Sequence, residues 1–331
     1  MELLAHEGGE AAADARARGL AEAWAFLGDA WPEVPSERLA REALGGLARC
    51  GAVWTLGGEQ GGWDWLAGLE TLAFDSRVFG RSLGRLAPLW HRHAWPGEGP
   101  AGAELVRAAV AGAWERGLEG LTARVPCRDF AAGEALEAAG FRLRDVSVEW
   151  GLALGGARPG PGSLPEGLEL GTWRPEQEEA LADLAARSFC SLADYADRFA
   201  LDPRLRPGCP ALYREWLANS LHGDQADQVL VLARGEDPVG FISLKLPPAA
   251  GTAAGCGWVA LNALEPAWRG RGLYHHLLAR GLGWLEERGA ARARVRTKLS
   301  QAAVIRAWSR LGARQISADY TFHLWRDDAK E

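Results

Sequence analysis

Apolar residues in the second half of the chain recur with two periods, one typical of strands and one typical of helices. Strands are predicted over 168–173, 228–233, 239–246, 258–264, 292–297 and 315–325, and helices over 176–189, 212–221, 273–288 and 301–311. Strands mixed with helices in this order indicate a twisted mixed sheet in an α/β or α+β domain.

Part of this order occurs twice, because Gly289 lies 172 positions after Gly117 and the pattern around each glycine agrees. Both copies give helix, strand, helix, glycine and strand, which indicates a duplication. The Gly- and Pro-rich run 155–165 separates the copies and cannot hold a helix. We therefore expect two domains, residues 1–154 and 167–331, joined by a linker at 155–166. Ahead of the first copy, helical spacing predicts two helices at 10–27 and 36–49.

Composition narrows the function classes. The 331 residues carry a net charge of −6, and the chain has no long basic run, which argues against nucleic-acid or anionic-membrane binding. The five cysteines are far apart and form no CxxC pair, so neither a disulfide framework nor a metal site is predicted. The chain shows neither a signal-peptide pattern nor an apolar run of membrane-spanning length, so we expect a cytoplasmic protein. Its oligomeric state is left open.

The most informative stretch is Val259 to Gly272, an apolar strand followed by a turn at Pro266 and by alternating Arg and Gly. A helical pattern begins directly after it. The N–H groups of a first helical turn and the helix dipole favour an anion at this position, and two arginines add full positive charge. Glycine lets the backbone approach a ligand closely. The stretch therefore predicts a diphosphate site.

Arg269-Gly270-Arg271-Gly272 resembles the acyl-CoA-binding motif of the GNAT superfamily of N-acetyltransferases, although Tyr274 stands where that motif has a small residue. The resemblance implies two tandem GNAT-like domains, each a twisted mixed sheet flanked by helices, and acetyl-CoA as co-substrate. It also implies direct attack of an amine on the thioester. The expected acetyl-CoA contacts are Ala263, Leu264, Arg269, Gly270, Arg271, Gly272, Leu273, Tyr274 and Trp308.

Trp308 stands where the family usually has the tyrosine that protonates the leaving thiolate. An indole is no proton donor at neutral pH, so either the thiolate leaves unassisted or Tyr274, Ser309 or Tyr320 replaces that tyrosine. Asn262 is a candidate to orient a water. In the first copy the motif positions hold 97–102, where both arginines are missing and Glu98 adds negative charge, so we expect no CoA site there.

A narrower resemblance concerns the acceptor. The segments 72–86 and 197–220 resemble the dTDP-fucosamine acetyltransferases, which acetylate a nucleotide-linked amino sugar. This resemblance implies acceptor contacts from Asp75, Ser76, Phe79, Arg198 and Tyr213. Two alternatives remain open at this point. One is a tandem GNAT protein acting on another small amine, such as an antibiotic, a thiol–sugar conjugate or a peptide N-terminus. The other is a non-catalytic CoA sensor.

Overall fold

The computed structural model describes residues 3–7, 49–57, 63–91, 99–158, 160–193, 195, 197–246 and 255–328. Its chain forms two compact units: Met1–Val146 with Ala318–Glu331, and Ser147–Ser317. These boundaries differ from the predicted ones at the last strand of each copy. The helices predicted at 10–27 and, except for its last residue, at 36–49 lie outside the described residues.

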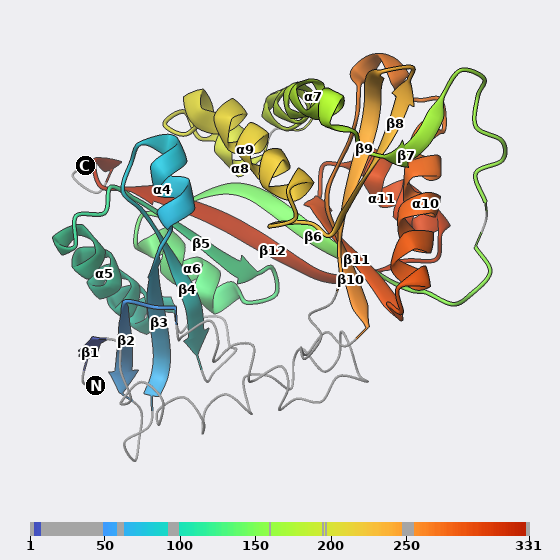
Figure 1. Cartoon of the computed structure of the whole chain (residues 1–331). Coiled ribbons are helices and arrows are strands. Elements are labelled where there is room, and N and C mark those ends of the chain that lie inside the picture. Colours follow the sequence, from blue (N-terminus) through green and yellow to red (C-terminus); the bar gives the residue numbers. More distant parts are fainter. Residues whose placement is uncertain are drawn as a thin grey trace. The chain divides into compact units, whose positions relative to one another are not determined.

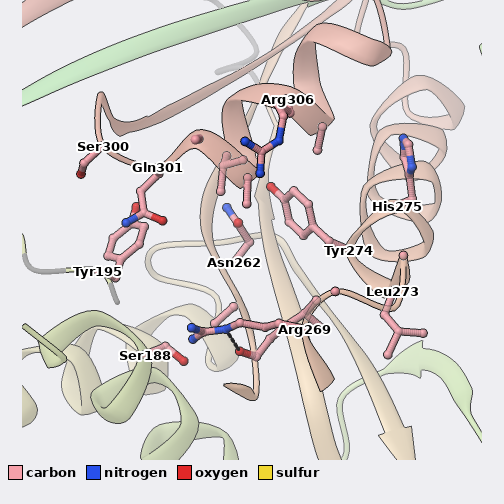
Figure 2. Close-up of a pocket in the computed structure, with 18 of the residues that line it drawn as sticks. Ser188, Tyr195, Asn262, Arg269, Leu273, Tyr274, His275, Ser300, Gln301 and Arg306 are labelled. Atoms are coloured by element: carbon pink, nitrogen blue, oxygen red, sulfur yellow. Dashed lines mark hydrogen bonds between the residues drawn. The ribbon is translucent and has the colours of Figure 1, made fainter. Parts of the chain in front are cut away.

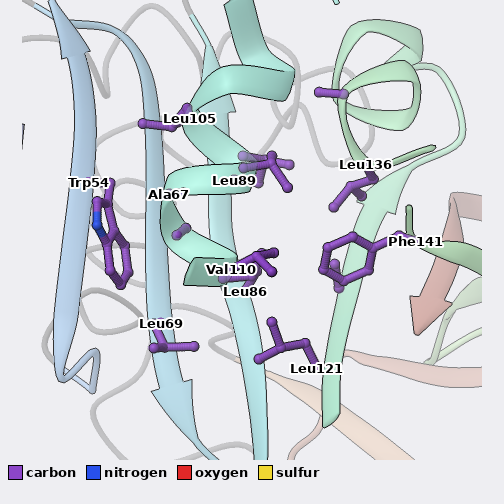
Figure 3. Packing of buried hydrophobic residues seen from close by; sticks show 14 of the residues in the cluster. Trp54, Ala67, Leu69, Leu86, Leu89, Leu105, Val110, Leu121, Leu136 and Phe141 are labelled. Carbon is purple, nitrogen blue, oxygen red and sulfur yellow. The ribbon is translucent and has the colours of Figure 1, made fainter. Parts of the chain in front are cut away.

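The first unit is a sheet with helices packed against it (Figure 1). Its core joins Trp54, Leu86, Leu105 and Leu136, all almost fully buried, from two strands and the two longer helices (Figure 3). The elements are β1 (Leu3–Glu7), β2 (Ala52–Gly57), β3 (Trp63–Thr71), α4 (Ala73–Phe79), β4 (Leu83–His91), α5 (Gly99–Glu115), β5 (Gly120–Pro126), α6 (Phe130–Ala138) and the first part of β6 (Arg142–Ala153).

The second unit has the mixed sheet that the sequence predicts, with helices on both faces. Helix α10 packs on one face of strands β8 to β11, and the core of this unit lies between them. Helix α7 packs on β9 and β10 from the other face (Figure 1). The elements are β7 (Glu169–Thr172), α7 (Glu178–Cys190), α8 (Arg198–Leu201), α9 (Cys209–Leu221), β8 (Gln228–Arg234), β9 (Asp237–Lys245), β10 (Cys256–Leu264), α10 (Leu273–Glu287), β11 (Arg292–Lys298), α11 (Ala302–Arg310) and the start of β12 (Arg314–Trp325).

The last strand of each copy pairs with the other copy's sheet. Strand β6, which ends the first copy, pairs with β11 from Ser147 opposite Lys298 to Ala153 opposite Arg292. Strand β12, which ends the second copy, pairs with β5 from Asp319 to Trp325. This exchange explains why residues 318–331 belong to the first unit.

Within the second unit, the observed elements follow the hydrophobic pattern closely. The predicted helix 273–288 is α10, and its buried residues recur at helical spacing, from Leu273 to Leu277 and Leu278 and on to Leu285. The strand predicted at 292–297 is β11, whose buried residues alternate. The short helix α8, which begins at Arg198, was not predicted. Its cap comes from the Asp197 carboxylate, which accepts hydrogen bonds from the backbone N–H groups of Phe199 and Ala200.

Candidate functional site

The candidate site lies where β10 and β11 diverge. These parallel strands pair only from Cys256 opposite Arg292 to Val259 opposite Val295. Beyond this point β10 has a bulge, and the Ser243 hydroxyl bonds the backbone of Leu261 there. The two strands run on, paired with β9 and β6 instead, so a wedge opens between them.

A pocket of about 590 Å³ occupies this region, a size typical of sites for small ligands. Its walls come from the end of β10, the start of α10, α11 and the end of α7. Figure 2 shows the Asn262 amide, the Tyr274 hydroxyl and the Arg306 guanidinium pointing into the same space. The lining includes Arg269, Arg306 and Arg310, and none of the described residues that line it is Asp or Glu. The pocket is therefore suited to an anionic ligand.

The Arg/Gly loop, Arg269 to Gly272, leads directly into α10. Gly270 and Gly272 both adopt left-handed backbone conformations, with φ of 75° and 77°, and Gly272 is the N-cap of the helix. A side chain is disfavoured in that conformation, so the glycines are required by the turn itself. Arg269 donates from Nε to the backbone oxygen of Leu264 at 3.1 Å, which holds the loop against the end of β10 (Figure 2).

Trp308 stands at the position where the family usually has its tyrosine. Tyr274 lies next to Trp308. Trp308 is fully buried in the core, and its Nε1–H donates to the Tyr274 hydroxyl at 3.4 Å. Burial raises the pKa of Tyr274 well above 10, and the hydrogen bond from Trp308 opposes that rise only in part. The Tyr274 hydroxyl therefore stays protonated at neutral pH and remains able to donate a hydrogen bond.

The other proton-donor candidates lie elsewhere. Ser309 is exposed on α11 and does not line the pocket. Tyr320 belongs to β12 in the first unit, where it lines a separate pocket of about 240 Å³. Of the three candidates, only Tyr274 is brought to the wedge. Most of the predicted acetyl-CoA contacts line the pocket as well. The exceptions are Trp308, which belongs to the core, and Arg271, whose guanidinium stacks on the Trp268 ring at 5.0 Å.

The predicted acceptor contacts divide between the two units. Tyr213 is buried beneath the α7 side of the second unit, where it donates to Asp197 and stacks on Phe189. Burial raises its pKa well above the usual value. Arg198 stacks on Phe199 at 4.0 Å. Asp75, Ser76 and Phe79 belong to α4 of the first unit, and Ser76 Oγ accepts from the backbone N–H of Leu83 at 2.9 Å.

Two groups that line the pocket were not predicted. Arg306 and Arg310 lie four residues apart on α11 and both reach the pocket. Their spacing, which places them on one face of a helix, was the available signal. Ser188 and Phe189 come from α7 on the other side. Tyr195 lines the same side of the pocket, and its hydroxyl lies 3.4 Å from Thr297 Oγ1 at the wedge.

The corresponding place in the first unit is filled by side chains. Strands β4 and β5 also pair over four positions before they diverge. There the His91 ring packs on Trp65 with centroids 4.5 Å apart and its Nε2 lies 2.7 Å from the Asp129 carboxylate, the N-cap of α6. The Trp65 ring lies against Gly102 in α5 so closely that a Cβ there would clash. Glu98 itself lies outside the described residues.

Comparison with known proteins identifies the segment that carries this site. Residues 191–313 match the Acetyltransferase (GNAT) family, and they contain both sides of the wedge, the Arg/Gly loop and α11. This segment is similar to the GNAT family of acetyltransferases. The match agrees with the GNAT resemblance inferred from the Arg/Gly loop, and the members of that family are acyltransferases.

Solved structures extend the likeness to the whole chain. A GCN5-related N-acetyltransferase from Sphaerobacter thermophilus matches with a TM-score of 0.66 and 18% identity, over 98% of this chain and 95% of that one. A tandem GNAT protein from the clavulanic acid biosynthesis pathway matches with a TM-score of 0.56 and 13% identity, over 98% of both chains. At these identities the likeness concerns the fold, and it confirms the predicted α/β class with tandem GNAT-like lobes.

One curated relative is similar over about half of the chain. The spore coat polysaccharide biosynthesis protein SpsD of Bacillus subtilis (strain 168) is 27% identical over 163 residues, which cover 49% of this chain. The chain spans about half the length of that relative, 52%. Within the described residues, no helix is long and apolar enough to cross a membrane, and no group of three His, Cys, Asp or Glu side chains is placed to hold a metal ion.

Proposed function

We propose that this protein transfers the acetyl group of acetyl-CoA to the amino group of a nucleotide-linked amino sugar, of the dTDP type. The observation that carries the acetyl-CoA half is the wedge pocket, with three arginines, two left-handed glycines and no described carboxylate in its lining. The acceptor half is supported by the segments that resemble dTDP-fucosamine acetyltransferases and by a relative whose name assigns it to polysaccharide biosynthesis.

In this proposal, the Arg/Gly loop binds the diphosphate of acetyl-CoA. The backbone N–H groups at the start of α10 and the guanidinium groups of Arg269 and Arg271 would hold its oxygens. Arg306 and Arg310 add positive charge from α11 on the opposite wall. The β10 backbone at Ala263 and Leu264 would align the pantetheine arm along the wedge, which directs the thioester toward Asn262.

Catalysis requires little beyond alignment and proton handling. Holding the amine and the thioester in contact supplies effective molarities that reach roughly 10⁵ M or more. As the amine nitrogen bonds to the acetyl carbon and the carbon–sulfur bond breaks, Tyr274 donates its hydroxyl proton to the sulfur. The amine loses a proton to water, which Asn262 would orient, and Tyr274 regains one from solvent. The products are the amide and the free thiol.

Trp308 acts on this step through Tyr274. Its indole N–H donates to the Tyr274 oxygen, so the hydroxyl hydrogen is directed elsewhere. We assign Tyr274 as the general acid and Trp308 as the residue that positions it. Together they replace the single tyrosine that the family usually has. Asp75, Ser76, Phe79, Arg198 and Tyr213 remain predicted contributors to the acceptor side.

The test is thiol release from acetyl-CoA with purified protein and a panel of dTDP- and UDP-linked amino sugars, with the free amino sugars and unrelated amines as comparison. We expect release with a nucleotide-linked sugar at a kcat/KM at least about 100-fold above that for the free sugar, the size of effect that one or two charge-assisted contacts supply. Turnover only with unrelated amines would refute the acceptor. CoA binding without any turnover would refute catalysis.

A further inference from the structure

The sheet face of the second unit opposite α10 carries a row of cations along β11. Ala293 and Val295 point into the core, so the residues between them point to the other face. Those alternate positions hold Arg292, Arg294, Arg296 and Lys298. Over the paired stretch of β6, Ser147 to Ala153, the described side chains include a single carboxylate, Glu149. Along this pair of strands, the described side chains therefore carry more positive than negative charge.

Glu149 binds two of these cations at once. Its Oε1 lies 3.1 Å from Arg294 Nη1, and its Oε2 lies 2.6 Å from Arg296 Nη2. The carboxylate side chain is 6% exposed, whereas the Arg294 and Arg296 side chains are 32% and 26% exposed. Glu149 therefore ties the two guanidinium groups together on this face of the sheet.

Arg294 is fixed on both sides. Its guanidinium stacks on the Trp258 ring of β10 at 4.2 Å, while one nitrogen is tied to Glu149. A guanidinium has five donors in a rigid planar fork, and the contact to Glu149 uses Nη1. The group is therefore pre-oriented and still partly exposed, as a binding site for phosphate oxygens requires.

The cluster formed by Arg294, Arg296 and Glu149 lies beside the wedge. Arg296 directly follows Val295, the last residue of β11 that pairs with β10. Thr297, the next residue, contacts Tyr195, which lines the pocket. Arg294 and Arg296 lie outside the pocket lining, whereas the diphosphate site of the Arg/Gly loop lies at the start of α10.

We propose that Arg294, which Glu149 and Trp258 hold in place, binds the diphosphate of the acceptor with Arg296 beside it on β11. This inference rests on the proposed function, because it assigns the acceptor an anionic group that the free amino sugar lacks. The protein then has two separate diphosphate sites, one for each substrate. Selectivity for the nucleotide-linked sugar comes from β11, and Trp258 and Glu149 act as positioning residues.

The test compares Arg294→Gln with Arg294→Lys and with the control Arg280→Gln. Arg280 lies on α10, outside the pocket lining, and pairs at the surface with Glu287 at 3.3 Å. We expect Arg294→Gln to raise the KM of the nucleotide-linked acceptor by roughly 10- to 100-fold, with the KM of acetyl-CoA and turnover of the free amino sugar unchanged. Arg294→Lys keeps the charge without the fork and should fall between. Arg280→Gln should match the wild-type protein.

Equal losses for the nucleotide-linked and free sugars, or no loss with Arg294→Gln, would overturn the assignment. A binding experiment separates it from the proposed function, with dTDP titrated by calorimetry into protein already saturated with CoA. Binding of dTDP to the wild-type protein that Arg294→Gln abolishes supports the second anion site even if no sugar is acetylated. Absence of dTDP binding by the CoA-saturated wild-type protein would refute the site even if acetylation occurs.

Discussion

Replacement of Tyr274 by Phe tests the central chemical assignment, because it removes one hydroxyl and leaves the ring in place. The Tyr274 hydroxyl lines the wedge pocket and accepts a hydrogen bond from Trp308 Nε1–H at 3.4 Å. A general acid contributes roughly 10²- to 10⁴-fold to a rate, which corresponds to about 2.7–5.5 kcal/mol of barrier. We therefore expect kcat to fall by at least about 100-fold, with the KM of acetyl-CoA nearly unchanged.

The same substitution has a cost in stability that is measured separately. Trp308 is fully buried, so its Nε1–H loses its acceptor in Tyr274→Phe. An unsatisfied buried donor costs about 1–3 kcal/mol, which for a unit of this size lowers Tm by roughly 2–10 °C. Assays at 25 °C and a thermal melt of the same preparation distinguish loss of catalysis from loss of folded protein.

The control is Trp308→Phe, which keeps the Tyr274 hydroxyl and removes its partner. It should lower stability as well but reduce kcat far less, by about tenfold or below. Because burial holds the pKa of Tyr274 above 10, the wild-type rate should show no alkaline decline from this residue below pH 10. A Tyr274→Phe protein with wild-type kcat would refute the assignment. Equal losses of kcat in both variants would refute the division of roles.

The remaining predictions concern binding and stability. Arg269→Gln and Arg271→Gln should each raise the Kd of CoA roughly 10- to 100-fold by calorimetry, and unchanged affinity in the double variant would contradict the loop assignment. The wild-type chain should bind one CoA, since side chains fill the counterpart place in the first unit; a stoichiometry of two would refute this. Gly272→Ala should cost about 1–2 kcal/mol in urea unfolding because φ is 77°, whereas Gly283→Ala in α10, where φ is not positive, should be neutral or stabilising. Burial raises the pKa of Tyr213 above its unfolded value near 10, so the free energy of unfolding should be greatest below pH 10 and decline above it; Tyr213→Phe should lessen that decline.

The Arg/Gly loop and the elements around it were predictable because local rules decide them. Helix α10 follows from apolar spacing, and the loop from glycines that the left-handed turn requires. The bond between Trp308 and Tyr274 was not predictable, since it joins residues 34 positions apart whose approach depends on packing of α10 against α11. The sequence indicated that the usual tyrosine was missing and offered Tyr274, Ser309 and Tyr320 as replacements without selecting among them.

Long-range pairing explains the domain boundaries. The hydrophobic pattern predicted a strand at 315–325 and a last strand in the first copy, but period-two alternation does not identify the partner of a strand. The duplicated order favoured two self-contained halves, each ending in its own strand. Pairing of β6 with β11 and of β12 with β5 assigns those strands differently.

The reciprocal pairing of β6 and β12 has a consequence for how the chain is made. When the ribosome has released the first copy, β5 still lacks its neighbour, because Arg124 contacts Thr321 197 residues later. An unpaired edge of this kind is open to association with other chains until it is covered. Contacts of such long sequence separation also slow folding. Cutting the gene at the linker would thus yield two fragments with incomplete sheets, and co-expression of the two fragments, rather than either alone, is the rational route to a split form of the protein.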